Sequence, residues 1–276
     1  METTTLAANQ WNGAEGHLWA TETARYDRML DPYGRALAGA LALAPGESVL
    51  DVGCGAGAST LAAAAAVGPG GRVRGVDLSA PLLEVAQARV AEMPQVELVH
   101  ADAATTPHPP ASFDAITSRF GMMLFPEPEA AFAHLAGALK PGGRLVFTTW
   151  AERAANAWMT IPLAAVAAHI ELPPPADDAP CAFALAAPSR IHELCAKAGF
   201  VDIRIVRREE RVHVGRDVTD TVAFYERTAG DLRAVLGDEL ADRIVATLRM
   251  ALVPYAEGDG VRLASAAWIV SARRAQ

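Results

Sequence analysis

The chain is poor in cysteine, in aromatic residues and in positive charge. Its 276 residues include only three cysteines, and no two of them form a CxxC pair. An odd number of scattered cysteines gives no disulfide framework and suits a reducing compartment. The formal net charge is −8, whereas binding to nucleic-acid phosphates requires a basic stripe. We therefore expect neither disulfides nor a nucleic-acid partner.

Long apolar runs are missing as well. The opening residues, METTTLAANQW, contain neither the basic nor the apolar region of a secretory signal. The most apolar run, TLAAAAAVG, is too short and too rich in alanine to cross a bilayer. We therefore expect a cytoplasmic protein without a membrane span.

A regular alternation of short apolar runs and helical segments begins at residue 48. Seven runs have the length and residue types of strands, and most are separated by a segment with helical spacing. They are residues 48–53, 72–78, 96–102, 112–120, 144–150, 201–214 and 261–273. This rhythm predicts an α/β fold with a doubly wound, seven-stranded, mostly parallel sheet whose last strand is antiparallel.

Segments outside this rhythm predict helical additions to the sheet. Two N-terminal helices are expected, at 14–30 and at about 33–43, the second ending before a Pro-Gly pair. The expected organisation is a helical lid at 1–44, a Rossmann-like core at 45–150, a cap insertion at 151–187, and the rest of the core at 188–276 with a helical insertion at about 216–258.

The stretch VLDVGCGAGAST at 49–60 runs from a strand through a glycine-rich turn into a helix. Gly53, Gly55 and Gly57 allow a sharp turn and a close approach of a ligand to the backbone. The free N–H groups at the helix start attract an anion, either a pyrophosphate or a carboxylate. With Ala58 the loop also satisfies GxGxxA, so it alone does not distinguish two nucleotide cofactors.

Two acidic residues at strand ends bear on which nucleotide cofactor the glycine loop holds. Asp77 ends the second strand, where a carboxylate can accept hydrogen bonds from ribose hydroxyls of either cofactor. Asp102 ends the third strand, where a carboxylate can accept a hydrogen bond from an exocyclic adenine amino group. A nicotinamide dinucleotide needs a second, repeated half of the sheet and a catalytic pair such as Tyr–Lys, and neither is found. This weakens the alternative of a NAD-dependent oxidoreductase.

Five segments resemble, in order and spacing, the motifs of class I S-adenosylmethionine-dependent methyltransferases. They are VLDVGCGAG, VRGVDLS, HADA, FDAITSRFGMMLF and LKPGGRLVFTTW. The resemblance is closest to the small-molecule group of ubiquinone and menaquinone biosynthesis. It covers about 45–150 strongly and 201–214 and 261–273 more loosely. It implies a Rossmann-like methyltransferase fold, S-adenosylmethionine as cofactor and S-adenosylhomocysteine as product.

The resemblance also implies cofactor-binding residues. The glycine loop would hold the methionine end, the acid after the second strand the ribose, and the residues after the third and fourth strands the adenine and the methyl-donor end. These residues are Asp51, Gly53, Gly55, Gly57, Asp77, Leu78, Asp102, Ala103, Ser118 and Arg119. SRFGMM replaces the Asp-Pro-Pro-type motif of amino-group methylation, and no metal-binding carboxylates of the catechol type can be placed. We therefore predict no metal.

Methyl transfer from a sulfonium is an in-line displacement, so positioning can supply much of the catalysis. A general base is required only when the acceptor must lose a proton. His17 is the best candidate, because the resemblance places the N-terminal helix over the cofactor. His169 and His213, with Glu171 behind them, are further candidates, and each histidine is better explained by packing or exposure than by catalysis.

Aromatic side chains of the N-terminal helices form a second group of candidates. Aromatic faces attract cations, so Trp19 and Tyr26, and less clearly Trp11, could cover the sulfonium. The alternative is ordinary helix packing, since aromatic residues at helical spacing usually belong to a core.

Residues at the ends of the fourth and fifth strands are expected to bind the acceptor, because ligands of open α/β sheets bind there. These are Phe120, Met122, Trp150, Asn156 and Trp158, with Met123 beside them. Their apolar character predicts a small hydrophobic acceptor, natural-product or quinone-like, and Asn156 could orient a polar group. An S-adenosylmethionine-binding cyclase remains an alternative, and a homo-oligomer is possible.

Overall fold

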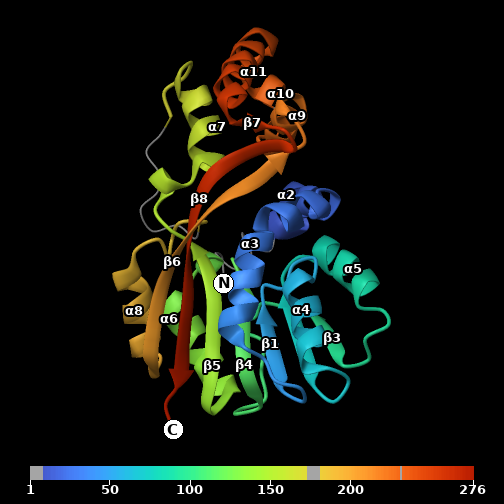
Figure 1. Cartoon of the computed structure of the whole chain (residues 1–276), viewed down its shortest axis with the longest axis vertical. Helices are drawn as coiled ribbons and strands as arrows, with labels where there is room; N and C mark the ends of the chain where they lie inside the picture. The colour runs from blue at the N-terminus through green and yellow to red at the C-terminus, as the bar shows by residue number, and fades with distance from the viewer. Residues whose placement is uncertain (1–8, 173–180, 231) are drawn as a thin grey trace.

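The computed structural model describes residues 9–172, 181–230 and 232–276. The first eight residues of the expected lid and most of the proline-rich stretch of the cap, 173–180, lie outside the described residues. The described chain is built around one mixed sheet with helices on both faces and a helical group at one end (Figure 1).

The sheet confirms the predicted fold class. Seven strands follow the order β3-β2-β1-β4-β5-β8-β6, and a two-residue strand, β7, pairs with β8. Strands β1 to β5 are parallel, and β8 runs antiparallel to both β5 and β6. The strands are β1 (Ser48–Val52), β2 (Arg72–Asp77), β3 (Val96–His100), β4 (Phe113–Arg119), β5 (Leu139–Trp150), β6 (Phe200–Gly215), β7 (Ala256–Glu257) and β8 (Gly260–Arg274).

Alternating side chains bury the two faces of the sheet against different helices. Val49 of β1 packs in a cluster with Ala63, Ala64 and Val67 of α4 (Ala58–Val67). On the same face, α3 (Thr23–Leu41) packs on β4 and β5, and α5 (Ala80–Arg89) packs on β2 and β3. Figure 1 shows α3 and α4 in front of the sheet.

The opposite face is more apolar. Leu50 belongs to the largest core cluster, together with Phe132 and Leu135 of α6 (Pro128–Ala138) and Ile191 of α8 (Pro188–Lys197). The period of two along a strand therefore assigns Asp51, one residue after Leu50, to the face that α3 and α4 cover.

The N-terminal helices end at positions other than those expected. Helix α2 (Ala14–Thr21) stops two residues after Trp19, and α3 runs through Pro32 without a break. Thr23 Oγ1 donates to the carbonyl oxygens of Trp19 and Ala20, which satisfies acceptors at the end of α2 and fixes the break there. A proline inside a helix is tolerated at a cost of one hydrogen bond.

A long two-stranded ribbon carries the helical cap. Strands β6 and β8 stay paired as far as Gly215 and Val261 and extend beyond the other strands (Figure 1). The cap helices gather at the end of this ribbon and are α7 (Ala157–Ala167), α9 (Val218–Thr228), α10 (Leu232–Leu236) and α11 (Asp238–Leu252). Three short 3-10 turns, at Met122–Leu124, Arg153–Ala155 and Val253–Tyr255, complete the described elements. The boundaries of lid, core and cap stay a prediction.

Candidate active site

The glycine loop between β1 and α4 has a backbone that other residues would strain. Gly53 has φ +63° and Gly57 has φ +84°, both in the left-handed region. A Cβ on Gly53 would come within 3.0 Å of Gly121 Cα, and one on Gly57 within 3.1 Å of Ala86 Cβ. The turn and its close packing against the chain after β4 and against α5 therefore require glycine at both positions.

Asp77 ties this loop to the end of β2. Its Oδ2 accepts from the Gly55 N–H at 2.7 Å, and its Oδ1 accepts from the Ser79 N–H at 2.8 Å. Burial raises the pKa of this carboxyl, and the two backbone donors oppose that shift. Asp77 thus fixes the loop, and its predicted contact with a ribose stays a prediction. Ser79, as expected, caps α5.

Asp51 lies fully buried beneath the loop. Its Oδ2 accepts from Thr60 Oγ1 at 2.6 Å and from Ser59 Oγ at 2.8 Å, both on the first turn of α4. Its Oδ1 has no hydrogen-bond partner within the described part of the chain. Burial raises the pKa of Asp51 to about 6. A buried acceptor without a donor costs free energy. The predicted contact of Asp51 with the methionine end of a cofactor stays a prediction.

The residues predicted to surround the adenine lie at the ends of β2 and β3. Asp102 closes its own turn, accepting from the Ala104 N–H at 2.8 Å and from Thr105 Oγ1 at 3.2 Å. Ala103 is buried beside it. The carbonyl oxygen of Leu78 accepts from Asn12 Nδ2 at 2.9 Å. The contacts of these residues with an adenine stay a prediction.

The N-terminal segment docks on this same edge of the sheet. Ser79 Oγ donates to the Trp11 carbonyl oxygen at 2.7 Å, and Asn12 Oδ1 accepts from the Ala80 N–H at 2.9 Å. A side chain on Gly16 of α2 would collide with Ser79 Oγ at 2.9 Å. These contacts hold the start of the lid against the loop that follows β2.

The lid aromatics stack on one another. The rings of Trp19 and Tyr26 are parallel, with centroids 3.6 Å apart, and Trp11 meets Trp19 edge-on at 5.9 Å. Tyr26 also meets Phe224 of α9 edge-on at 5.7 Å. One face of each stacked ring is therefore occupied by protein, which supports the packing interpretation. The predicted contact of Trp19 and Tyr26 with a sulfonium stays untested.

An ionic cluster that the sequence did not reveal joins the lid to the loop. Arg89 of α5 donates to the Ala56 carbonyl oxygen at 3.0 Å and to Asp27 Oδ2 of α3 at 2.8 Å. Arg119, at the end of β4, contacts Asp27 Oδ1 at 3.3 Å. Asp27 thus joins the glycine loop, α3 and β4. Charged residues on helix faces are common, so no local signal in the sequence marks Asp27 or Arg89.

The chain turns sharply after β4. Ser118 Oγ is buried and accepts from the Gly121 N–H at 3.2 Å. Phe120 adopts φ +65°, a left-handed conformation that is rare for a bulky residue. Its N–H donates to the Thr148 carbonyl oxygen at 3.2 Å. This strained turn aims the Phe120 ring at β5.

Most of the predicted acceptor residues lie in one aromatic cluster. Phe120 stacks on Trp150 at 4.1 Å, and Trp150 meets Trp158 at 4.9 Å. Tyr33 of α3, which the sequence did not single out, meets both Phe120 and Trp150 edge-on. Met122 is fully buried in the same core cluster. Burial raises the pKa of Tyr33 to about 12, and its hydroxyl lies 2.5 Å from Ser265 Oγ, so Tyr33 stays protonated at neutral pH.

Asn156 is engaged entirely by protein. Its Oδ1 accepts from Trp158 Nε1 at 2.9 Å and from the Ala266 N–H at 3.1 Å, and its Nδ2 donates to carbonyl oxygens including that of Ala266 at 3.2 Å. It is completely buried. These contacts pin the start of α7 to β8 and leave no polar atom of Asn156 for an acceptor, in contrast to the predicted orienting contact.

The candidate bases are dispersed. His17 is exposed on α2, its Nδ1 lies 2.8 Å from the Gly13 carbonyl oxygen, and its ring borders a shallow hollow between α2 and α5. His169 Nε2 contacts Thr247 Oγ1 in the cap, and His213 Nε2 lies 2.9 Å from the Asp259 carbonyl oxygen. Glu171 is exposed after α7. None of these contacts involves the aromatic cluster, and the catalytic assignment of His17 stays a prediction.

Within residues 9–172, 181–230 and 232–276, no group of three or more His, Cys, Asp or Glu is arranged to hold a metal ion. Over the same residues, no helix combines the length and hydrophobicity required to cross a bilayer.

Comparison with known families identifies the core. Residues 49–143, from β1 into β5, match the family model described as a methyltransferase domain. Over these residues the chain is similar to the methyltransferase domain family. The predicted resemblance to a methyltransferase family is confirmed for these residues.

Sequence relatives of the methyltransferase domain point to the same group. The demethylmenaquinone methyltransferase of Lysinibacillus sphaericus is 39% identical over 106 residues, which are 38% of this chain and 45% of the relative. The enzyme of the same name from Staphylococcus aureus is 44% identical over 101 residues, or 37% of this chain and 42% of the relative. The chain thus matches less than half the length of these relatives.

Solved structures share the fold over most of the chain. Phosphoethanolamine N-methyltransferase 2 of Haemonchus contortus, solved with phosphomonomethylethanolamine and S-adenosylhomocysteine, has a TM-score of 0.58 at 20% identity, covering 93% of this chain and 58% of that one. Geranyl diphosphate C-methyltransferase of Streptomyces coelicolor, solved with Mg²⁺, geranyl diphosphate and S-adenosylhomocysteine, has a TM-score of 0.51 at 21% identity, covering 90% and 80%. At these identities the likeness concerns the fold alone.

Proposed function

We propose that the chain transfers a methyl group from S-adenosylmethionine to a small, hydrophobic, quinone-like or natural-product acceptor. The observation that carries the proposal is the pair of acids around the glycine loop. Asp77 holds the loop through Gly55, and Asp51 keeps one buried oxygen without a partner beneath it. The demethylmenaquinone methyltransferases that match the core support a quinone-like acceptor.

The residues present fit an adenosyl amino acid. The N–H groups at the start of α4 suit its carboxylate, and Asp51 Oδ1 suits its ammonium group. Asp77 would accept from the ribose and Asp102 from the adenine, while Leu78 and Ala103 would pack against the ring. Ser118 and Arg119 would border the sulfur end. S-adenosylmethionine supplies a methyl group that is already activated on a sulfonium.

The protein's contribution is then mainly to position the acceptor and exclude water. The aromatic cluster of Phe120, Trp150 and Trp158 would provide apolar surface for the acceptor, under the cap. These side chains now pack against one another, so acceptor binding requires them to separate. No buried base faces this cluster among the described histidines, which favours an acceptor that is already ionised or loses its proton to water.

Ligand titration tests the cofactor assignment. We expect S-adenosylhomocysteine to bind with a micromolar Kd in calorimetry and NAD to give no heat. Asp77→Ala should weaken S-adenosylhomocysteine binding at least tenfold, because it removes an acceptor for the ribose and the tie to Gly55. Glu84→Ala on α5 is a suitable control and should leave Kd unchanged. NAD binding without adenosyl binding would contradict the proposal.

A labelled-methyl assay tests His17 and the cyclase alternative together. If His17 is the general base, His17→Ala should lower kcat at least a hundredfold with little change in KM for the cofactor. His192→Ala, on the exposed face of α8, is the control. Turnover that His17→Ala leaves intact would remove His17 from the mechanism. Product formation without label transfer would favour the cyclase.

A further inference from the structure

The connection between β3 and β4, residues 101–112, contains no helix, whereas the two connections before it contain α4 and α5. Its PHPP run at 107–110 disfavours a helix, because proline lacks a backbone donor and restricts the residue before it. Residues 102–106 form a turn whose later N–H groups donate to the Asp102 carbonyl oxygen. This turn carries Asp102 and Ala103, the residues predicted to surround the adenine.

Two histidines hold this turn by its carbonyl groups. His108 Nε2 lies 3.2 Å from the Ala103 carbonyl oxygen, and His134 Nε2, on α6, lies 2.8 Å from the Thr106 carbonyl oxygen. Since a carbonyl oxygen only accepts, each Nε2 carries a hydrogen and donates it. The turn is therefore held near both of its ends by imidazole side chains instead of by the hydrogen bonds of a helix.

The surroundings favour neutral imidazoles. The ring centroids of His108 and His134 are 5.2 Å apart, so protonation of both rings would place two positive charges side by side. His108 Nδ1 is buried without a hydrogen-bond partner in the described part of the chain, so a proton added there would lack an acceptor. Burial lowers the pKa of His108, the contact with Ala103 opposes this shift, and repulsion from His134 and Arg74 adds to it.

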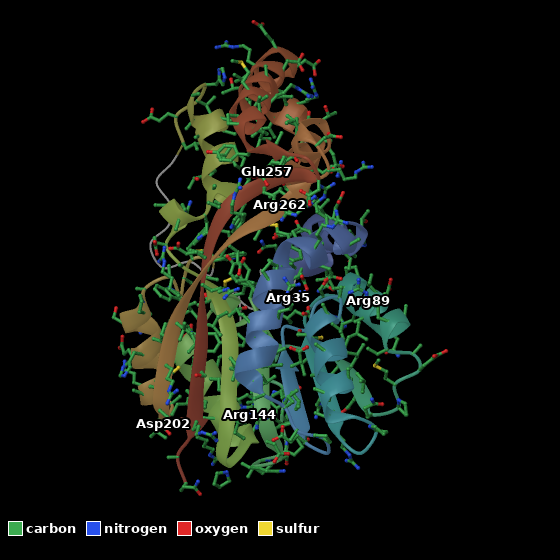
Figure 2. All side chains as sticks on the ribbon, viewed as in Figure 1. Arg35, Arg89, Arg144, Asp202, Glu257 and Arg262 are labelled. Atoms are coloured by element: carbon green, nitrogen blue, oxygen red, sulfur yellow. The ribbon has the colours of Figure 1, made fainter. Side chains whose placement is uncertain are left out.

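The charges around the histidine pair are mostly positive. Arg74 of β2 contacts only the exposed Glu97 of β3, at 3.8 Å, and the Asp102 carboxylate is engaged by donors of its own turn. In the part of the chain that the structure describes, no ion pair joins either histidine to a carboxylate. Arg89 differs, because it lies on the side of α5 (Figure 2) and contacts Asp27 at 2.8 Å.

We propose that His108 and His134 are positioning residues for the adenine end of the proposed cofactor site and make adenosyl binding depend on pH. While both imidazoles are neutral, they hold the turn and with it Asp102 and Ala103. On acidification the rings repel each other, a buried donor lacks an acceptor, and the turn loosens. The affinity for an adenosyl ligand therefore falls as the pH drops below about 6.5. The inference rests on the proposed function, which supplies the adenine.

Calorimetric titration of the full chain with S-adenosylhomocysteine at pH 7.5 and pH 5 tests the proposal. His108→Gln keeps an N–H near the place of Nε2 and cannot titrate, so at pH 7.5 it should restore most of the affinity that His108→Ala loses. Between the two pH values, the Kd of the wild type should rise at least threefold more than that of His108→Gln. Asp51 and Asp77, whose pKa values burial raises, titrate in both proteins, so this difference isolates the histidine pair.

A matched control and a measurement without ligand complete the test. His192→Gln, on the exposed face of α8, should keep the wild-type dependence on pH. If the Kd values of the wild type and His108→Gln rise equally, the inference is overturned. Absence of S-adenosylhomocysteine binding at both pH values would instead contradict the proposed function.

Nuclear magnetic resonance of the histidine rings then decides the inference without any cofactor. In the ligand-free chain, the midpoint of the His108 titration should lie below 6.5 and should rise in His134→Gln, because a neighbouring positive charge is removed. The wild type alone gives a second readout, since coupled histidines titrate in shared steps. Independent titration of the two rings would overturn the proposed pair, whether or not the variants fold.

Discussion

At the scale of single residues, Asp51 concentrates the chemistry of the site. The carboxyl is fully buried with one oxygen satisfied by two hydroxyls and the other by none. Its pKa is about 6 when folded, against an ordinary value of 3.8. The folded state therefore binds the proton more tightly than the unfolded state, and the resulting stability is present below about pH 4 and lost as pH rises through about 6.

The raised pKa of Asp51 predicts how the stability of the protein depends on pH. A shift of this size corresponds to about 3 kcal/mol lost between pH 4 and pH 7. Asp51→Asn cannot titrate, so its melting temperature should lack the fall over this interval that the wild type shows. Thermal melts at half-unit pH steps measure this, with Asp242→Asn on the exposed face of α11 as control. If the melting temperatures of the wild type and Asp51→Asn change with pH in parallel, the ionisation of Asp51 costs the folded state no stability, which contradicts this prediction.

At the scale of secondary-structure elements, one ion pair joins the lid to the cap. Arg25 of α3 donates to both carboxylate oxygens of Asp220 of α9, at 2.9 and 3.0 Å, and to the Val214 carbonyl oxygen at 2.6 Å. Its guanidinium also lies 4.7 Å from the Phe224 ring. Arg25 holds the pKa of Asp220 well below its usual range. Both side chains are mostly buried, which separates this pair from those on the surface.

A double-mutant cycle measures this link. We expect Arg25→Met and Asp220→Asn to be coupled by about 1.5–3 kcal/mol in urea unfolding, since the pair is bidentate and mostly shielded from water. The exposed pair Arg35 and Asp31, four residues apart on α3, is the matched control and should show about 0.5 kcal/mol or less. Equal coupling in both cycles would mean that the lid and the cap are held by packing alone.

At the scale of the whole molecule, the sheet was predictable because its signals are local. Buried strands show apolar runs, and Gly53 and Gly57 mark a backbone that other residues cannot adopt. The arrangement around the sheet was not predictable in the same way. The docking of Asn12 on Leu78 joins positions 66 residues apart, and the short helix α2 has no strongly amphipathic pattern to tell which of its faces would carry His17.

The residues of the candidate site fall into the same two groups: those that a local sequence signal predicts and those that depend on contacts between distant segments. Asp51, Asp77 and the glycine loop were identified from motifs, since they sit where each strand ends. Asp27 and Asn156 follow no motif, and their contacts come from elements that only the folded chain brings together. The position of Asn156 after a strand predicts a ligand contact, whereas in the folded chain its amide donates to the carbonyl oxygens of Glu152 and Ala266.

The β6–β8 ribbon has a consequence for how this protein can change. The segment that carries α9, α10 and α11 leaves the ribbon at Gly215 and returns next to it, at Val261. Because its two ends are paired neighbours, the segment is topologically one long hairpin loop, and its length can vary without displacing the parallel strands. Exchanging residues 216–259 for the corresponding segment of a protein of the same fold should therefore leave the parallel strands folded.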